Sequence, residues 1–387
     1  MKEKYDLIVV GGGVLGTFHA YHALKKGLKV ALLEKNQKPQ GATVRNFGQV
    51  VPSGMNTKWQ LFGRESLRIY KEIQSEFNIS VRQEGSVYLA SNDDEVQLLE
   101  ELHSINAANC YTSQLLTKNA CLDSYPNLRS DYVKAGLFFP EEVILEPLLM
   151  IHKLHKYLKT AGLDIFYDTA VLECYSISNG VDLHTADTRS FLAEKIVVCN
   201  GSDFNILYPK LFAESDLVVS KLQMMQTKPQ SNYRLKGSVL TGLSIRRYEA
   251  FAECPSYQAI KVREEKDSLV KKWGVHILFK QAADGSVILG DSHEYAAAKN
   301  IDTLGFDTNM DIDNFILQES QKIFDLSTYE IQKRWLGFYS QCENSDIFQH
   351  SVDGNIHIVT GIGGKGMTAS AGFAKANIDQ LFNLQNA

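Results

Sequence analysis

The chain has no run of about eighteen consecutive apolar residues, which is the length that a membrane-spanning helix needs. Its N-terminus lacks the apolar segment and small-residue cleavage site of a secretory signal, so we expect a cytoplasmic protein without a transmembrane segment. The six cysteines form no Cys-x-x-Cys pair, which argues against a zinc site and a disulfide framework, and we expect no metal. The chain also lacks a net positive charge, since 40 Lys and Arg stand against 45 Asp and Glu for a net charge of −5, and we expect no nucleic-acid partner.

The composition that remains is that of an ordinary globular protein. Hydrophobic residues make up 44% of the 387 residues and charged residues 22%, a balance that excludes a disordered or fibrous chain. A chain of this length is long for one core and comfortable for two domains.

The N-terminal segment reads as a strand, a glycine turn, a helix and a second strand. Asp6–Val10 is apolar and β-branched, as in a strand buried on both faces of a parallel sheet. Gly11–Gly16 follows, then a predicted helix over 17–26, then a second apolar run over 30–33 that ends at Glu34. This order predicts a right-handed βαβ unit.

Within this unit the glycines have the spacing G-x-G-x-x-G. Gly11 permits the tight turn, Gly13 lets the backbone approach a pyrophosphate, and Gly16 lets helix and strand pack closely. The helix N-terminus adds N–H groups and a partial positive charge. Glu34 follows Gly16 by 18 residues, where a carboxylate accepts hydrogen bonds from ribose hydroxyls. The unit therefore predicts a bound dinucleotide, FAD or NAD rather than NADP.

Two later glycine loops favour the larger cofactor. An NAD dehydrogenase usually continues with further βαβ units, and this chain does not. Instead it has a small-residue loop over Gly41–Gly48 and a second glycine loop, Gly361–Thr368, at the start of a predicted helix. Both loops present backbone N–H groups to anions, which suits FAD.

The rest of the chain predicts two kinds of sheet. Amphipathic spacing predicts helices over 57–77, 93–108, 148–161, 311–324 and 367–382, with strands over 81–90, 164–167, 193–198 and 356–360. Residues 216–295 are antiparallel in character, and 246 and 247 fall on a predicted strand. We expect an α/β plus α+β fold, in which a Rossmann-like FAD-binding domain (residues 1–80, 144–215 and 333–387) carries an inserted antiparallel-sheet substrate domain (residues 81–143 and 216–332).

Taken together, these motifs resemble those of the D-amino-acid oxidase superfamily of FAD-dependent oxidoreductases, which includes glycine and sarcosine oxidases. The likeness covers the whole chain and rests on the Gly11–Gly16 fingerprint with Glu34, the Gly41–Gly48 loop, Asp168–Val171 followed by Val197–Ser202, and Gly361–Thr368. Shorter motifs at Leu243–Phe251, Gly290–Tyr295 and Arg334–Tyr339 are similar to a bacterial clade associated with phosphonate breakdown, whose suspected substrates are 2-aminoethylphosphonate derivatives.

The resemblance implies a role for each motif residue. The FAD contacts would come from Gly11, Gly13, Gly16, Glu34, Lys35, Arg45, Asn46, Gly48, Val171, Asn200, Gly201, Gly363, Gly364, Lys365, Gly366, Met367 and Thr368. N–H groups and a cation in the last loop would stabilise negative charge on the reduced flavin. Some sarcosine oxidases tether FAD to a cysteine, but Trp335–Tyr339 has none and Cys342 lies further on, so we expect non-covalent FAD.

The substrate side points to an arginine. Arg246 and Arg247 are adjacent on the predicted strand, so at most one can face a flavin, where its planar fork would grip a carboxylate or phosphonate. The alternative is that both are surface charges. His293 lies in the Gly290–Tyr295 motif and is a candidate, whereas we interpret His276 as a core residue.

Three further side chains complete the expected site. Lys365 has few structural reasons to stand in a glycine loop. Trp335 and Tyr339 either wall the cavity or belong to the core. The expected catalytic set is therefore Arg246, Arg247, His293, Lys365 and Trp335.

These features lead to one expected activity and two alternatives. We expect hydride transfer from a small amine with an anionic tail to FAD, hydrolysis of the imine, and reoxidation by O2 or another acceptor. The first alternative is an FAD-dependent 2-hydroxy-acid dehydrogenase. The second is a flavin subunit that transfers electrons without a substrate of its own.

Overall fold

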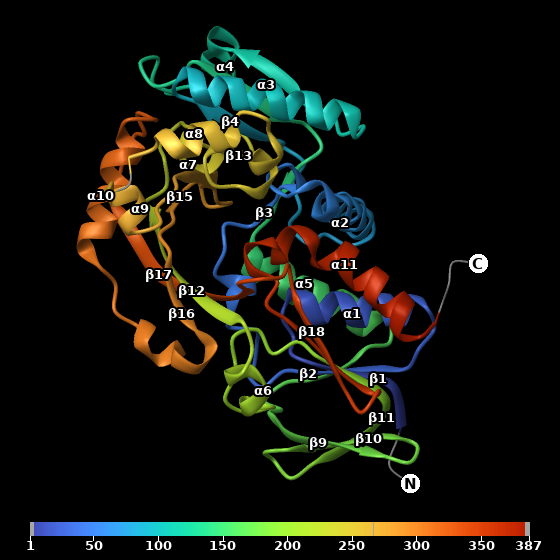
Figure 1. The fold of residues 1–387 in the computed structure, drawn as a ribbon. Coiled ribbons are helices and arrows are strands. Elements are labelled where there is room, and N and C mark those ends of the chain that lie inside the picture. The colour runs from blue at the N-terminus through green and yellow to red at the C-terminus, as the bar shows by residue number, and fades with distance from the viewer. Residues whose placement is uncertain (1–3, 266, 384–387) are drawn as a thin grey trace.

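The computed structural model describes residues 4–265 and 267–383. Two large β-sheets organise the chain, each with its own helices (Figure 1). The expected α/β plus α+β fold is confirmed, since one sheet is mostly parallel and the other mostly antiparallel. Within the described ranges, no helix is long and apolar enough to cross a membrane.

The first sheet contains the predicted βαβ unit. Its strands are β1 (Lys4–Val10), β2 (Val30–Leu33), β8 (Asp164–Phe166), β9 (Val171–Ile177), β10 (Gly180–Thr185), β11 (Ser190–Val198), β18 (Phe348–Val352) and β19 (Ile356–Thr360). The strand order is β18-β19-β11-β1-β2-β8, and β19, β11, β1, β2 and β8 run parallel. β1 and β2 are buried between layers, which explains their apolar, β-branched sequences.

Helices cover one face of this sheet and a hairpin covers the other. The helices are α1 (Val14–Lys25), α2 (Thr57–Glu76), α5 (Pro147–Thr160) and α11 (Gly366–Leu381). α1, α5 and α11 lie over the strands, and β9–β10 lies on the opposite side (Figure 1). α2 packs on α11, where Trp59 stacks on Phe373 with ring centroids 5.7 Å apart. Aromatic side chains therefore form the interface between α2 and α11.

The second sheet forms the other half of the molecule. Its strands are β4 (Ser86–Ala90), β5 (Gln114–Thr117), β6 (Ala135–Phe139), β12 (Leu217–Thr227), β13 (Ser238–Leu240), β14 (Leu278–Gln281), β15 (Val287–Gly290), β16 (Glu294–Ala297) and β17 (Ile331–Cys342). The order is β16-β12-β15-β14-β13-β4-β6-β5, with β17 also paired to β12. Every pair is antiparallel except β13 with β4. This sheet supports the loops that carry the substrate-side residues.

Short elements complete the chain. The remaining helices are α3 (Asp93–Ala108), α4 (Lys118–Ser124), α6 (Pro209–Ala213), α7 (Gly242–Ile245), α8 (Tyr257–Arg263), α9 (Leu269–Lys272) and α10 (Met310–Gln321). The 3-10 turns are η1 (Ala42–Val44), η2 (Pro52–Gly54), η3 (Glu249–Glu253), η4 (Ala298–Leu304) and η5 (Gly363–Lys365). β3 (Gln49–Val50) and β7 (Val143–Ile144) form a two-stranded sheet.

The segment that carries the two arginines is not a strand. α7 ends just before Arg246, and η3 begins at Glu249. Ile245 and Phe251 are buried and Tyr248 is partly buried, and the three recur at every third residue, which is the period of a 3-10 turn rather than of a strand. The strand prediction was therefore wrong, because a helical spacing was interpreted as alternation.

The boundary between the two sheets also differs from the expected one near the C-terminus. Residue 333 was the expected start of the last FAD-domain segment. β17 instead pairs with β12 from Leu217–Cys342 to Thr227–Ile331, so it belongs to the second sheet. The chain returns to the first sheet only after Cys342, at β18. The partner strand of β17, which is β12, lies more than a hundred residues earlier in the chain. The local sequence pattern of β17 does not reveal such a distant partner.

Candidate functional site

A long cleft lies at the carboxyl ends of the parallel strands. β1, β2, β11 and β19 end at Val10, Leu33, Val198 and Thr360, and the residues just after these ends line the cleft. This edge of an open parallel sheet is where such folds bind ligands. The position of the cleft therefore follows from the topology of the sheet.

Glycine is required where the first turn meets the neighbouring strand. Gly11 has a φ of +106°, and a Cβ there would lie 2.2 Å from the carbonyl oxygen of Cys199. A Cβ at Gly16 would lie 2.1 Å from the carbonyl oxygen of Gly11. Any side chain would push β1, α1 and β11 apart. The glycines thus bring the N–H groups at the start of α1 to the floor of the cleft.

Glu34 is held rigidly at one side of the cleft. Its Oε2 accepts a hydrogen bond from the Gly12 N–H at 2.9 Å, and its Oε1 accepts one from the Asn36 N–H at 3.0 Å. The residue is 6% exposed, yet it lines the cleft. Oε1 also accepts from the Asn36 side-chain amide at 3.1 Å, so Oε2 is the oxygen that can accept a second hydrogen bond, from a hydroxyl group of a ligand.

Most of the expected cofactor residues meet in this cleft, and four do not line it. Those that line it are Gly11, Gly13, Gly16, Glu34, Lys35, Asn46, Val171, Asn200, Gly201, Gly363, Gly364, Gly366 and Met367. Arg45 donates from Nε to the Gln40 carbonyl at 3.2 Å, and Gly48 packs on Leu145, so both are outside. Lys365 and Thr368 line the second cavity instead.

A second cavity adjoins the cleft on the side of the second sheet. Asn46, Tyr339, Gly361, Gly363, Gly364 and Met367 line both spaces. Part of the remaining wall comes from residues near β14, β15 and η3, including Arg247, His276, Asp291 and His293, and the rest comes mainly from the segments 47–55 and 341–346. A reactive group of a ligand in the cleft can therefore face a second molecule in the cavity.

The two adjacent arginines have different environments. Arg246 faces away from the cavity and donates to Glu95 Oε1 at 2.9 Å and to Glu264 Oε1 at 3.3 Å. Arg247 lines the cavity, donating from Nη1 to the Gly274 carbonyl at 3.3 Å and from Nη2 to the Tyr295 hydroxyl at 2.8 Å. Only one of the pair faces the cavity, and it is Arg247. Arg246 is a structural ion-pair residue.

Lys365 and Trp335 also differ from one another. Lys365 lines the cavity, pairs with Glu249 Oε1 at 2.9 Å and lies 5.5 Å from the ring centre of Trp59. Trp335 does not line the cavity. Its Nε1–H donates to the Arg45 carbonyl at 3.1 Å, and its ring packs against the core of the second sheet. Tyr339, which lines both spaces, donates to the same carbonyl at 3.2 Å.

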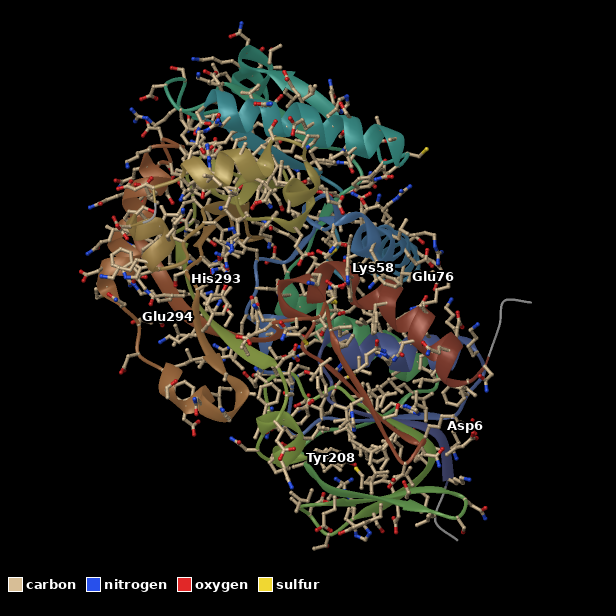
Figure 2. The ribbon with its side chains drawn as sticks, viewed as in Figure 1. Asp6, Lys58, Glu76, Tyr208, His293 and Glu294 are labelled. Atoms are coloured by element: carbon tan, nitrogen blue, oxygen red, sulfur yellow. The ribbon has the colours of Figure 1, made fainter. Side chains whose placement is uncertain are left out.

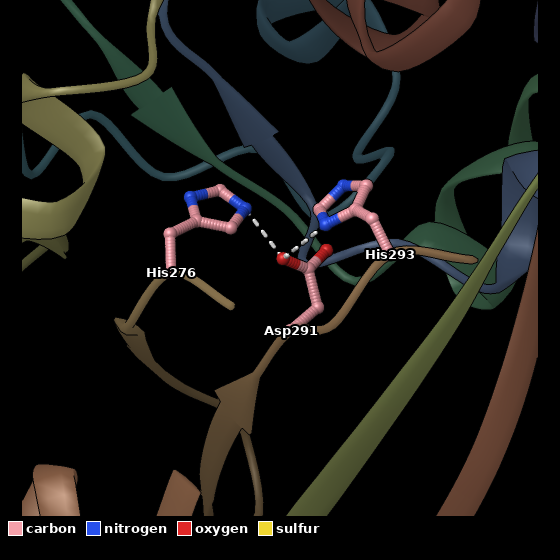
Figure 3. Close-up of side chains that lie close together, drawn as sticks. All are labelled: His276, Asp291 and His293. Atoms are coloured by element: carbon pink, nitrogen blue, oxygen red, sulfur yellow. Dashed lines mark ion pairs between the residues drawn. The ribbon is translucent and has the colours of Figure 1, made fainter. Parts of the chain in front are cut away.

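Three side chains meet on the cavity wall where β15 ends (Figure 3). Asp291 Oδ1 contacts His276 Nε2 and lies 3.9 Å from His293 Nδ1. Figure 2 places His293 on the inner side of the second sheet and its neighbour Glu294 at the outer edge. Sequence reasoning did not include Asp291, and His276, which it assigned to the core, is buried as expected but also lines the cavity. The only available signal was their place in and near the Gly290–Tyr295 motif.

The protonation of this cluster follows from its hydrogen bonds. His293 Nδ1 lies 2.9 Å from the Gly274 carbonyl, so this nitrogen carries the proton. Burial lowers the pKa of His293 from 6.5 to about 3, so the ring is neutral at physiological pH. Burial raises the pKa of Asp291, but the neighbouring His276 and Arg247 outweigh that effect and hold the pKa below its ordinary value. Asp291 is therefore a buried carboxylate anion.

Two imidazoles and a carboxylate are also a possible metal-ligand set. The three ligand atoms lie within 4.8 Å of one another. A metal needs nitrogen lone pairs that point at the ion. Here His293 Nδ1 donates to a carbonyl and His276 Nε2 contacts the Asp291 carboxylate. In this arrangement the His293 Nδ1 lone pair therefore does not point at a shared ion.

Comparison with known proteins reveals related chains. The family described as DAO, FAD dependent oxidoreductase, matches residues 6–380. A glycerol 3-phosphate dehydrogenase of Caloramator mitchellensis is 24% identical over 98% of this chain and 74% of its own length. A glycine oxidase of Bacillus licheniformis is 26% identical over 52% of this chain and 55% of its own length, so the match spans about half of that relative. The solved glycine oxidase of Geobacillus kaustophilus superposes with a TM-score of 0.77 at 17% identity, over 99% of this chain and 96% of its own.

The cleft fits the cofactor that the family name states. FAD needs hydroxyl acceptors, pyrophosphate donors and a flavin site next to the substrate. Glu34 supplies the first, the α1 N-terminus behind Gly11 and Gly13 supplies the second, and the Gly361–Met367 loop borders both spaces. The ends of the parallel strands and the closely packed glycine turns thus leave a space suited to an extended dinucleotide.

Proposed function

This chain belongs to the DAO family of FAD-dependent oxidoreductases, and we propose that it oxidises a small amine with an anionic tail. The observation that carries the proposal is the placement of Arg247. Its guanidinium lines the cavity that adjoins the FAD cleft, and the Gly274 carbonyl and the Tyr295 hydroxyl fix it from behind.

Arg247 has capacity left for a ligand. A guanidinium offers five N–H donors in a planar fork, and the two described contacts use two of them. The remaining donors suit a carboxylate or a phosphonate, which binds such a fork through two oxygens. Lys365 adds a second cation to the wall, although Glu249 already pairs with it. The anionic tail therefore binds at Arg247.

The chain's own residues orient the substrate. FAD, when bound, supplies the acceptor for the hydride. Arg247 holds the tail, which directs the amine end of a short substrate toward the Gly361–Met367 border of the two spaces. Backbone N–H groups of that loop stabilise negative charge at this border. Water then hydrolyses the released imine, and O2 or another acceptor reoxidises the flavin.

The finer proposal is an amine with a phosphonate tail, such as 2-aminoethylphosphonate or its N-methyl derivative. The motifs at Gly290–Tyr295 and Arg334–Tyr339 support it, and so does the arginine fork. The Caloramator relative is named for a phosphate ester, which is an anion of similar shape. We further propose that FAD is bound non-covalently and that the protein is cytoplasmic.

One alternative has its own support. The glycerol 3-phosphate dehydrogenase match extends along 98% of the chain, and that enzyme by its name oxidises an alcohol. A hydroxylated anion, including a 2-hydroxy acid, is therefore the second candidate substrate class. The same arginine would hold its anionic group.

Anaerobic mixing of the holoenzyme with candidate substrates tests both proposals. The panel contains 2-aminoethylphosphonate, its N-methyl derivative, glycine, sarcosine, D-alanine, glycerol 3-phosphate and lactate, and the readout is loss of flavin absorbance. Bleaching by the phosphonate amines supports the finer proposal, and bleaching by amino acids alone keeps only the amine class. Bleaching by the alcohols alone would replace the first proposal with the second.

A further inference from the structure

Asp291 is a carboxylate in the same cavity wall as Arg247. We infer that Asp291 binds the substrate nitrogen and stabilises the positive charge that this nitrogen carries. The inference rests on the proposed function, since it concerns the amine end of the same substrate. It assigns a role to a residue that neither the motifs nor the relatives single out.

The surroundings of Asp291 show that its position is fixed. The residue is 4% exposed, follows the last residue of β15 and lines the cavity. Both imidazole contacts use Oδ1, through His276 Nε2 and His293 Nδ1. Among the described residues, no hydrogen bond to Oδ2 is seen, so this oxygen is available to a ligand. His276 and His293 act as positioning residues for the carboxylate.

A buried anion in a binding cavity needs a compensating charge. Burying an isolated carboxylate costs several kcal/mol unless it is paired. His293 is neutral, so among the described residues Asp291 has its direct contact with His276 and shares the cavity wall with the Arg247 guanidinium. When the anionic tail of the substrate binds Arg247, the guanidinium charge is shared between the tail and the Asp291 carboxylate. A substrate that also carries a cation gives Asp291 a further partner of opposite charge. The wall is therefore complementary to a zwitterion.

The chemistry uses the same charge. The bound ammonium loses a proton to water, which exposes the nitrogen lone pair. The adjacent C–H bond then breaks, its electron pair leaves with the hydrogen as hydride to FAD, and the lone pair forms a C=N bond. The nitrogen of this iminium carries a full positive charge, which the Asp291 carboxylate stabilises. Water adds to the iminium carbon, and the C–N bond breaks to give a carbonyl compound and an amine or ammonia.

The same carboxylate disfavours the alternative substrates. A 2-hydroxy acid or a glycerol phosphate brings no cation, so its hydroxyl would meet an anion with no charge to neutralise. Asp291 therefore makes the cavity selective for amines over alcohols of the same size and tail.

Two sulfonates that differ only at this end test the inference by binding. Taurine carries an ammonium and isethionate a hydroxyl, on the same two-carbon chain and tail. Calorimetry on the oxidised holoenzyme should show taurine bound roughly tenfold more tightly. Asp291→Asn, which is isosteric and neutral, should remove that preference, and Asp291→Glu should retain it. A wild-type enzyme that binds both sulfonates equally would overturn the inference, whether or not the variants fold.

Two other carboxylates serve as controls. Asp313 is buried in α10, pairs with Arg334 and does not line the cavity, so Asp313→Asn should leave the preference unchanged. Glu249 lines the cavity beside Lys365. A preference that is lost in Glu249→Gln but kept in Asp291→Asn would assign the charge to Glu249 and overturn the inference.

Kinetics separate this inference from the proposed function. With the amine that reduces the flavin fastest, Asp291→Asn should lower the anaerobic reduction rate by roughly 100-fold while FAD stays bound. If no amine reduces the flavin, the proposed function fails, and the sulfonate binding still decides the role of Asp291. If amines reduce Asp291→Asn as fast as the wild type, the inference fails and the proposed function stands.

Discussion

Replacing Arg247 by alanine should weaken substrate use without weakening the fold. The side chain lines the cavity, and its two described contacts go to a carbonyl and a hydroxyl rather than to a carboxylate. Its loss therefore breaks no direct ion pair, and Asp291 in the same wall keeps its contact with His276. Hydrogen bonds to charged groups contribute about 1.5–3 kcal/mol each, so losing a two-oxygen grip corresponds to a loss of roughly 100-fold to 10,000-fold in kcat/KM.

Arg246 is the matched control, because it is the neighbouring residue of the same type. Arg246→Ala removes the ion-pair partner of Glu95, which is 3% exposed, whereas Glu264 keeps its pairs with Lys261 and Lys271. Leaving a buried carboxylate unpaired costs about 3–5 kcal/mol. We therefore expect a clear fall in Tm for Arg246→Ala, with KM near the wild-type value.

Two measurements on the same proteins distinguish these outcomes. Thermal unfolding gives Tm, and anaerobic flavin reduction at varied substrate concentration gives the apparent affinity. We expect Arg247→Ala to lose substrate affinity but keep its Tm, and Arg246→Ala to lose Tm but keep its substrate affinity. Unchanged kcat/KM in Arg247→Ala would refute the anchor, and so would an equal loss of affinity in both variants.

Three further outcomes are expected. Burial lowers the pKa values of His19, His22 and His155 from 6.5 to about 4, so the unfolded chain binds more protons between these pH values. Stability should fall as the pH drops from 6.5 toward 4, by up to ~3 kcal/mol for each histidine, and a flat Tm across that range would contradict these assignments. Acid precipitation should release all of the flavin into the supernatant, whereas yellow colour in the pellet would indicate a covalent bond. Dialysis against EDTA should leave flavin reduction unchanged, and loss of activity restored by a divalent metal would mean that His276, Asp291 and His293 bind an ion.

Local sequence predicted the cofactor side well. The turn at Gly11–Gly16 and the carboxylate of Glu34 depend on neighbours within one βαβ unit, so their spacing determines their geometry. α3 and α11 begin and end within about one residue of the expected bounds, because each is amphipathic or bounded by a glycine loop. Short-range sequence patterns therefore predicted most of the residues that line the FAD cleft.

The substrate side depended on contacts between distant segments. Arg247 acquires its direction from Gly274 and Tyr295, and Arg246 from Glu95, which lies in α3. No spacing in the sequence distinguishes the two arginines. Asp291 likewise has its direct contact with His276, which lies just before β14. Such contacts form only in the folded sheet. The sequence could therefore propose both arginines as candidates but could not say which of them faces the cavity.

The central claim is that this flavoenzyme oxidises an amine that carries an anionic tail. The most direct test mixes the anaerobic holoenzyme with 2-aminoethylphosphonate and, separately, with 2-hydroxyethylphosphonate, which has the same tail and length. The account predicts that the amine bleaches the flavin and that the alcohol does not. Bleaching by the alcohol with none by the amine would contradict it.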